Sequence, residues 1–243
     1  SERTWANHTI FGSTEHRKVA REAVRKSLVL LKNKQKILPL SKYDRIIVTG
    51  KNAHNVGHQC GGFTIAWQGV SGNHEFHGAN SIWQGIKEVA PNAVLNTEGD
   101  MSAICAKAYD IAIVVIGESP YAEGLGDIRD CNNIIIEAGS QVNGQMNISQ
   151  PYGNSVELNK LHPEEYQQIK ELYNKGIPVV VILISGRTLM INSELEKSVA
   201  FIAAWLPGSE GKGISDVLFG DFNFQGKLPF TWPKDPSSGK KEA

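Results

Sequence analysis

Four apolar runs rich in β-branched residues constrain the fold of this chain most strongly. They are RIIVTG (45–50), DIAIVVIG (110–117), PVVVILIS (178–185) and VAFIAA (199–204). Each run is apolar throughout instead of alternating, and helical patterns separate the runs, as in strands whose two faces are both buried. We therefore predict an α/β fold, a three-layer α/β/α sandwich with a mostly parallel, doubly wound sheet of flavodoxin-like order.

The segments between these runs carry helix signals. Ser13 or Thr14 can cap a helix that the spacing of Val19, Ala23, Leu30 and Leu31 extends to about Asn33, and its basic residues are expected to form a solvated face. Pro163 opens another helix, which ends at Gly176. Further helical stretches are predicted at 80–90, with Asn80 as the cap, and at 101–108, 190–197 and 211–219, with a short strand within 91–96.

Two connections are too long for ordinary strand-to-helix loops, which usually take about 2–6 residues. They follow the first and third predicted strands, at 51–79 and 118–161. In a flavodoxin-like order these strands are neighbours at the topological switch point, where open α/β sheets bind ligands. We therefore expect the two loops to rise side by side from the carboxyl edge of the sheet.

Both loops contain groups that suit chemistry on a sugar. The first holds CGGFTIAWQG (60–69), in which Trp67 either stacks on a sugar ring or plugs the loop onto the sheet. The second opens with GESPYAEGLGD (117–127) and offers Glu118, Glu123 and Asp127. Glu118 lies nearest the strand, whereas Glu123 is far enough out to project into a cleft as a general acid. Judged from the residues alone, three solvated loop carboxylates are the simpler interpretation.

Composition excludes several functional classes. Lys+Arg and Asp+Glu both number 25, so neither nucleic acid nor a membrane is expected as a partner. The longest apolar run, 178–184, is far shorter than the ~20 residues of a membrane helix. An odd number of cysteines without CxxC spacing argues against a disulfide framework. We predict no cofactor. We also predict no metal site, because the surrounding Gly and Asn residues prevent a helix that would place the candidate ligands on one face; these are His54, His58, Cys60, His74 and His77.

Five motifs in order and spacing resemble the carboxy-terminal α/β domain of family 3 glycoside hydrolases, especially their β-glucosidase and exo-1,3/1,4-β-glucanase branch. The resemblance covers about Glu15 to Trp232 and rests on HRKVAREAVRKSLVLLKN (16–33), CGGFTIAWQG, GESPYAEGLGD, VILISGR (181–187) and AAWLPGSEGKGISDVLFGDFNFQGKLPFTW (203–232). It implies a domain at 15–232, an interdomain linker at 1–14 and a disordered tail at 233–243.

The resemblance also implies a site shared between two domains. Glu123 matches the general acid/base of a retaining glycosidase, and Trp67 matches one jaw of an aromatic clamp on the sugar. Phe63, where plant relatives commonly have Trp, is expected to bind substrate as well. The nucleophile is expected on an N-terminal (β/α)8 barrel, which leaves this chain catalytically incomplete by itself.

Further expectations follow from the same resemblance. The expected partners are that barrel and a β-glucan or β-glucoside oligosaccharide, and the expected location is secreted or periplasmic, although 1–11 lack an apolar signal core. Ala66, Thr188 and a long 128–155 loop depart from the family pattern, and the loop is expected to reshape the aglycone side of the cleft. A non-catalytic β-glucan-binding module and a structural remnant remain as alternatives.

Overall fold

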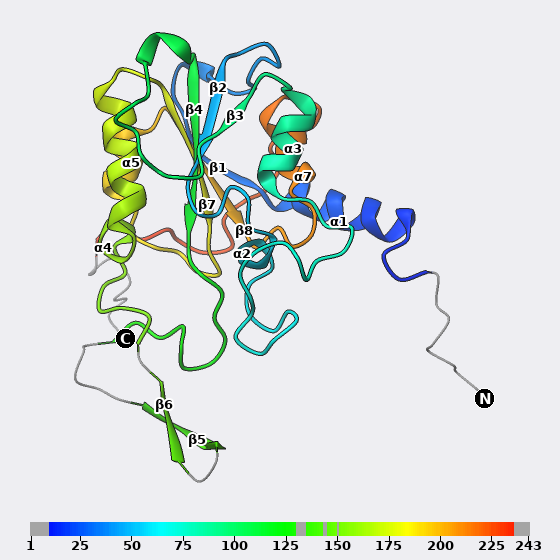
Figure 1. The fold of residues 1–243 in the computed structure, drawn as a ribbon, viewed down its shortest axis with the longest axis vertical. Coiled ribbons are helices and arrows are strands. Elements are labelled where there is room, and N and C mark those ends of the chain that lie inside the picture. The colour runs from blue at the N-terminus through cyan, green and yellow to red at the C-terminus, as the bar shows by residue number, and fades with distance from the viewer. Residues whose placement is uncertain (1–9, 130–134, 143–144, 150, 236–243) are drawn as a thin grey trace.

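A six-stranded sheet forms the centre of the molecule (Figure 1). The computed structural model describes residues 10–129, 135–142, 145–149 and 151–235, and for 135–142 and 145–149 it describes the backbone alone. Across the sheet the strands are β1 (Val29–Asn33), β8 (Ala200–Trp205), β7 (Val179–Ile184), β4 (Ile111–Gly117), β2 (Ile46–Thr49) and β3 (Val94–Leu95). All neighbours are parallel except β1 and β8. Counted along the chain, the parallel strands follow the order 2-1-3-4-5, so the predicted flavodoxin-like order is confirmed.

Helices cover both faces of the sheet (Figure 1). One face is covered by α1 (Thr14–Ser27), α3 (Ile82–Val89) and α7 (Lys212–Leu218). The other is covered by α4 (Leu158–Leu161), α5 (Pro163–Asn174) and α6 (Asn192–Lys197). The remaining helical pieces are α2 (Val56–Cys60), within the first long loop, and two 3-10 turns, Lys34–Lys36 and Ala106–Ala108. The predicted three-layer sandwich is therefore confirmed, and of the helix predicted at 101–108 only the last of these turns forms.

The continuous apolar runs build two cores, one on each side of the sheet. In β4, Ile113 and Val115 pack toward α3 and α7, whereas Val114 and Ile116 pack toward α5. All four side chains are buried. Burying an aliphatic side chain of this size contributes roughly 1.5–3 kcal/mol, so a strand that is apolar on both faces stabilises both layers.

The helix predicted to continue to Asn33 is wrong in its second half. Helix α1 ends at Ser27, Leu28 is extended, and Val29–Asn33 form the edge strand β1. Here the chain pairs antiparallel with β8. The spacing of Leu30 and Leu31 fits either a helix or a strand. The edge of β8 has backbone N–H and C=O groups that a strand can pair with and a helix cannot, so this segment forms a strand.

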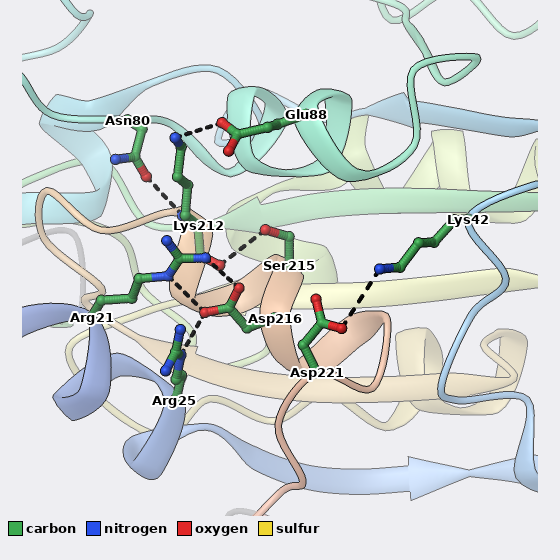
Figure 2. A network of polar contacts seen from close by, with 9 residues as sticks. All are labelled: Arg21, Arg25, Lys42, Asn80, Glu88, Lys212, Ser215, Asp216 and Asp221. Carbon is green, nitrogen blue, oxygen red and sulfur yellow. Dashed lines mark hydrogen bonds and ion pairs between the residues drawn. The ribbon is translucent and has the colours of Figure 1, made fainter. Parts of the chain in front are cut away.

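The basic residues of α1 form the expected solvated face only in part: Lys18 and Lys26 are exposed, whereas three arginines make ion pairs with the helical layer. Arg21 and Arg25 both donate to the buried carboxylate of Asp216 on α7, with Nε to Oδ2 distances of 2.7 and 2.5 Å (Figure 2). One turn earlier, Arg17 pairs with Glu210 at 2.9 Å. Burial alone would raise the pKa of Asp216, but the hydrogen bonds from the two arginines outweigh it and lower that pKa. These pairs fasten α1, and with it the start of β1, to the helical layer.

Asn80 caps a different helix from the one predicted. Its side-chain oxygen accepts a hydrogen bond from the backbone nitrogen of Lys212, the first residue of α7, at 2.7 Å (Figure 2). Helix α3 is capped by Ser81, which forms a reciprocal capping box with Gln84. One asparagine thus joins the end of the first long loop to the helix that follows β8.

Glu194 on α6 is a buried carboxyl group that makes stability depend on pH. Its side chain is 1% exposed, and burial, followed by the charge of Glu157, raises its pKa to about 7. Its stabilising contribution is therefore complete below the unfolded-state pKa of 4.5 and is lost as the pH rises through 7. We expect Glu194→Gln to raise the free energy of unfolding by up to about 3 kcal/mol at pH 8 and to change it little at pH 4.

Urea unfolding at the two pH values measures this difference. Glu196→Gln is the matched control, because Glu196 lies on the same helix and is exposed. An equal effect of Glu194→Gln at both pH values would contradict the prediction.

A two-stranded hairpin extends from the second long loop, beyond the carboxyl edge of the sheet (Figure 1). Its strands are β5 (Ile135–Val142) and β6 (Gln145–Ser149), so this part of the loop has regular secondary structure. The effect of this segment on the aglycone side stays a prediction. Most of the predicted linker and tail lies outside the described residues, at 1–9 and 236–243, and both also stay predictions. Within the described chain, no helix is both long and apolar enough to span a bilayer.

Candidate active site

The two long loops leave the sheet from adjacent strands, β2 and β4, as expected. These strands pair in parallel, with Thr49 opposite Val114. The first residue after β2 and the last residue of β4 are Gly50 and Gly117, with φ of +98° and +145°. A Cβ at Gly117 would lie 1.8 Å from the carbonyl oxygen of Ile184 on β7, so only glycine fits this turn. Both loops therefore start at fixed points on one edge of the sheet.

The first loop displays two aromatic side chains on a tight turn. The backbone nitrogen of Phe63 donates to the carbonyl oxygen of Trp67 at 2.8 Å, which closes the turn. Phe63 and Ile65 both adopt positive φ, at 57° and 65°, which costs roughly 1–3 kcal/mol for each residue. The side chains of Phe63 and Trp67 are 69% and 47% exposed. The turn therefore carries two unfavourable contributions, its backbone strain and the exposure of its two aromatic side chains to solvent.

Glu123 of the second loop meets Trp67 of the first. The indole Nε1 of Trp67 donates a hydrogen bond to Glu123 Oε2 at 2.5 Å. Glu123 Oε1 has no hydrogen-bond donor among the described residues. The predicted meeting of an indole and an acid at one rim is therefore present, although they are separated by 56 residues in sequence.

Glycines bring the two loops into backbone contact. A Cβ at Gly62 would lie 2.1 Å from the carbonyl oxygen of Tyr121, and one at Gly69 would lie 2.5 Å from Cβ of Pro120. Real Cβ atoms do not approach so closely, so both positions require glycine for this packing. Gly62 and Gly69 thus permit the close contact between the two loops.

Glu118 anchors the base of the second loop. Its carboxylate is buried, 4% exposed, and accepts hydrogen bonds from Tyr121 Oη, Ser185 Oγ and Arg187 Nε at 2.7–2.8 Å. The guanidinium of Arg187 also lies over the rings of Tyr121 and Tyr152, 4.5 and 5.4 Å from their centroids. Burial, followed by the charge of Glu118, raises the pKa of Tyr121, so its hydroxyl stays a donor. The Glu118–Arg187 pair joins the loop after β4 to the one after β7.

The comparisons with known proteins identify the family. The family described as Glycosyl hydrolase family 3 C-terminal domain matches residues 28–242. The chain belongs to this family. The predicted resemblance is therefore confirmed.

Solved structures and characterised relatives of this family 3 domain share most of its length. The exo-1,3/1,4-beta-glucanase of a Pseudoalteromonas species is 41% identical, with a TM-score of 0.76 over 92% of this chain and 33% of that one. The Listeria innocua beta-glucosidase crystallised with glucose is 28% identical, with a TM-score of 0.67 over 91% and 27%. The lysosomal beta glucosidase of Dictyostelium discoideum is 30% identical over 91% of this chain and 26% of its own length. The domain thus spans about a quarter to a third of these proteins.

Each carboxylate of the second loop has a different environment in this family 3 domain. Glu118 is buried in the anchor, Glu123 lies at the exposed rim beside Trp67, and Asp127 pairs with Arg129 at 3.6 Å. Only Glu123 combines exposure with a neighbouring aromatic side chain. Sequence reasoning missed the buried pair of Arg187 with Glu118, although the polar SGR segment directly after the apolar run of β7 was a signal for it, and it missed the hydrogen bonds of Gln68 to Ala122 and Glu123.

Two histidines of the first loop in the family 3 domain have structural partners. His54 Nδ1 lies 2.7 Å from Ser81 Oγ, and His58 Nε2 lies 2.8 Å from Ser71 Oγ. Burial lowers the pKa of His58 to about 4. Among the described residues, no three His, Cys, Asp or Glu side chains gather closely enough to hold a metal ion. Cys131 lies outside the described residues, while Cys60 and Cys105 are free.

Proposed function

We propose that this chain supplies the general acid/base and part of the sugar-binding surface of a retaining β-glucosidase or exo-β-glucanase. The observation that carries the proposal is the Glu123 carboxylate held against the exposed indole of Trp67 at the loop rim. The nucleophile would come from a (β/α)8 barrel, as the family resemblance implies. β-Glucosides and β-glucan oligosaccharides are the proposed substrates, in keeping with the names of the relatives.

Each residue has a defined part in the proposed reaction. A barrel carboxylate attacks the anomeric carbon while Glu123 gives its proton to the glycosidic oxygen, which leaves with the bonding electrons as an alcohol. Glu123, now a carboxylate, then takes a proton from water as the water oxygen displaces the barrel carboxylate. This sequence requires the two carboxyl groups to approach within ~5–5.5 Å. Glu123 Oε1, without a donor in the described chain, is the oxygen available for both proton transfers.

Trp67 can hold Glu123 and a sugar at once. Its N–H lies in the plane of the ring and is occupied by the carboxylate, whereas a sugar would stack on the ring face. The exposed ring of Phe63 extends the apolar surface on the same turn. We also propose a secreted or periplasmic location, because the relatives include periplasmic and lysosomal β-glucosidases.

A chimera tests this proposal: the chain replaces the matching segment of the Pseudoalteromonas exo-glucanase. We expect the purified chain to hydrolyse no aryl β-glucoside and the chimera to do so, because only the chimera contains both carboxylates. Turnover by the purified chain that disappears in Glu123→Gln would contradict the proposed division of the site. A folded but inactive chimera would contradict the catalytic role.

The exposure of Phe63 and Trp67 also favours a second function, a non-catalytic β-glucan-binding module. Titration of the chain with laminaribiose and cellobiose, followed by Trp fluorescence, separates the possibilities. Saturable binding together with an inactive chimera supports the module, and absence of both supports a structural remnant.

A further inference from the structure

Gln68 connects the two loops at the residue that bears the proposed acid. Its side-chain oxygen accepts a hydrogen bond from the backbone nitrogen of Ala122 at 2.7 Å. Its side-chain nitrogen donates to the backbone oxygen of Glu123 at 3.3 Å. One amide group thus holds the backbone at two points, the nitrogen of Ala122 and the carbonyl oxygen of Glu123.

The neighbouring residue completes this attachment. Trp67 holds the side chain of Glu123, and Gln68 holds its backbone. The other hydrogen bonds of residues 122–124 run within the loop, to Leu125, Gly126 and Asp127. In the described chain, the hydrogen bonds that tie Glu123 to the first loop therefore come from two consecutive side chains.

The backbone contacts between the loops make this bridge possible. Gly62 and Gly69 bring the first loop against Tyr121 and Pro120, so the two backbones are already in contact when they reach Gln68. With the nitrogen of Ala122 and the carbonyl oxygen of Glu123 both held, the backbone between them is restricted, and the side-chain rotations of Glu123 are the main remaining freedom. The hydrogen bond from the indole of Trp67 then selects one arrangement of the carboxylate.

We infer that Gln68 is a positioning residue for the acid/base Glu123, an inference that rests on the proposed function. It acts through the backbone of the acid and does not touch substrate. Misplacing a reacting group by about 1 Å lowers catalytic rates by about 100-fold, so removing both hydrogen bonds of Gln68 is expected to slow proton donation.

The test uses Gln68→Met in the exo-glucanase chimera, since methionine keeps the side-chain volume and removes both hydrogen bonds. We expect kcat/KM on laminaribiose to fall about 10- to 100-fold, because kcat/KM reports the step in which the leaving group departs and needs a proton. On 2,4-dinitrophenyl β-glucoside the loss in kcat/KM is expected to stay below about 3-fold, because this leaving group departs without a proton. Gln167→Met, on an exposed face of α5, is the matched control.

The leaving-group comparison separates positioning from a structural role. A loop that is merely loosened would lower kcat/KM equally on both substrates, and that result, or no loss on either, would overturn the inference. Glu123→Gln in the same chimera reports on the proposed function itself. If Glu123→Gln abolishes turnover of laminaribiose and Gln68→Met does not lower it, the proposed function stands and the role of Gln68 fails.

Discussion

Glu123→Gln in the exo-glucanase chimera is expected to lower kcat on β-linked disaccharides by about 10²–10⁴-fold, the range for loss of a general acid. Glutamine keeps the size of the side chain and an oxygen that can accept from Trp67 Nε1, but it carries no proton that can be donated to a leaving alcohol. The loss in kcat/KM should shrink on 2,4-dinitrophenyl β-glucoside, because that phenolate leaves unprotonated, whereas kcat on it stays low because attack by water still lacks its base. Steady-state kinetics on both substrates measure the effect.

A second variant separates acid/base catalysis from loop structure. Glu123→Ala leaves space where azide can enter and attack the anomeric carbon of the glycosyl-enzyme without base assistance. We expect azide to restore turnover and to give a β-glucosyl azide, because two inversions retain configuration. Asp127→Asn is the matched control, since it removes a carboxylate from the same loop away from Trp67. Equal losses in Glu123→Gln and Asp127→Asn would contradict the assignment of Glu123.

Arg187→Met is expected to lower the free energy of unfolding by about 3–5 kcal/mol at pH 7, the cost of leaving a buried charge without its partner. The carboxylate of Glu118 is buried, and Arg187 supplies its only cationic partner in the described chain. The substitution also removes the guanidinium that lies over Tyr121 and Tyr152. Urea unfolding followed by circular dichroism measures the change.

An exposed ion pair provides the control for Arg187. Arg45 donates to Asp110 through two nitrogens, but both side chains are open to solvent. Arg45→Met is therefore expected to change stability little. Glu118→Gln combined with Arg187→Met should recover part of the lost stability, because the uncompensated charge is gone. If Arg187→Met were as mild as Arg45→Met, the anchoring role would be wrong.

The sheet could be predicted from sequence because buried parallel strands leave a local signature. Runs such as 110–117 are apolar on both faces, short and rich in β-branched residues, which favours a buried strand over a buried helix. The flavodoxin-like order was expected from the alternation of strands and helices, and together with the two long loops it predicted Trp67 and Glu123 at one edge of the sheet. The family resemblance, not the pattern, assigned their chemical roles, which remain proposals.

The predictions that failed depended on distant partners. Residues 29–33 fit a helix as well as a strand, and only the open edge of β8, some 170 residues later, decides between them. Arg21 and Arg25 look solvated until α7 brings Asp216 to them. Gln68 has no local sequence signal, because its side chain bonds to backbone atoms of Ala122 and Glu123, 54 and 55 residues further along the chain.

The glycine-fitted contact between the loops has a consequence for engineering. Gly62 and Gly69 hold the first loop against the stretch around Tyr121, and the β5–β6 hairpin follows later in the second loop. Replacing the hairpin by shorter or longer inserts should leave the spacing of indole and carboxylate as it is, provided that Tyr152, which contacts Arg187, is kept. Under the proposed function, the hairpin can then be redesigned for new aglycones, while Trp67 and Glu123 keep their geometry when the domain is joined to a barrel from another enzyme of the family.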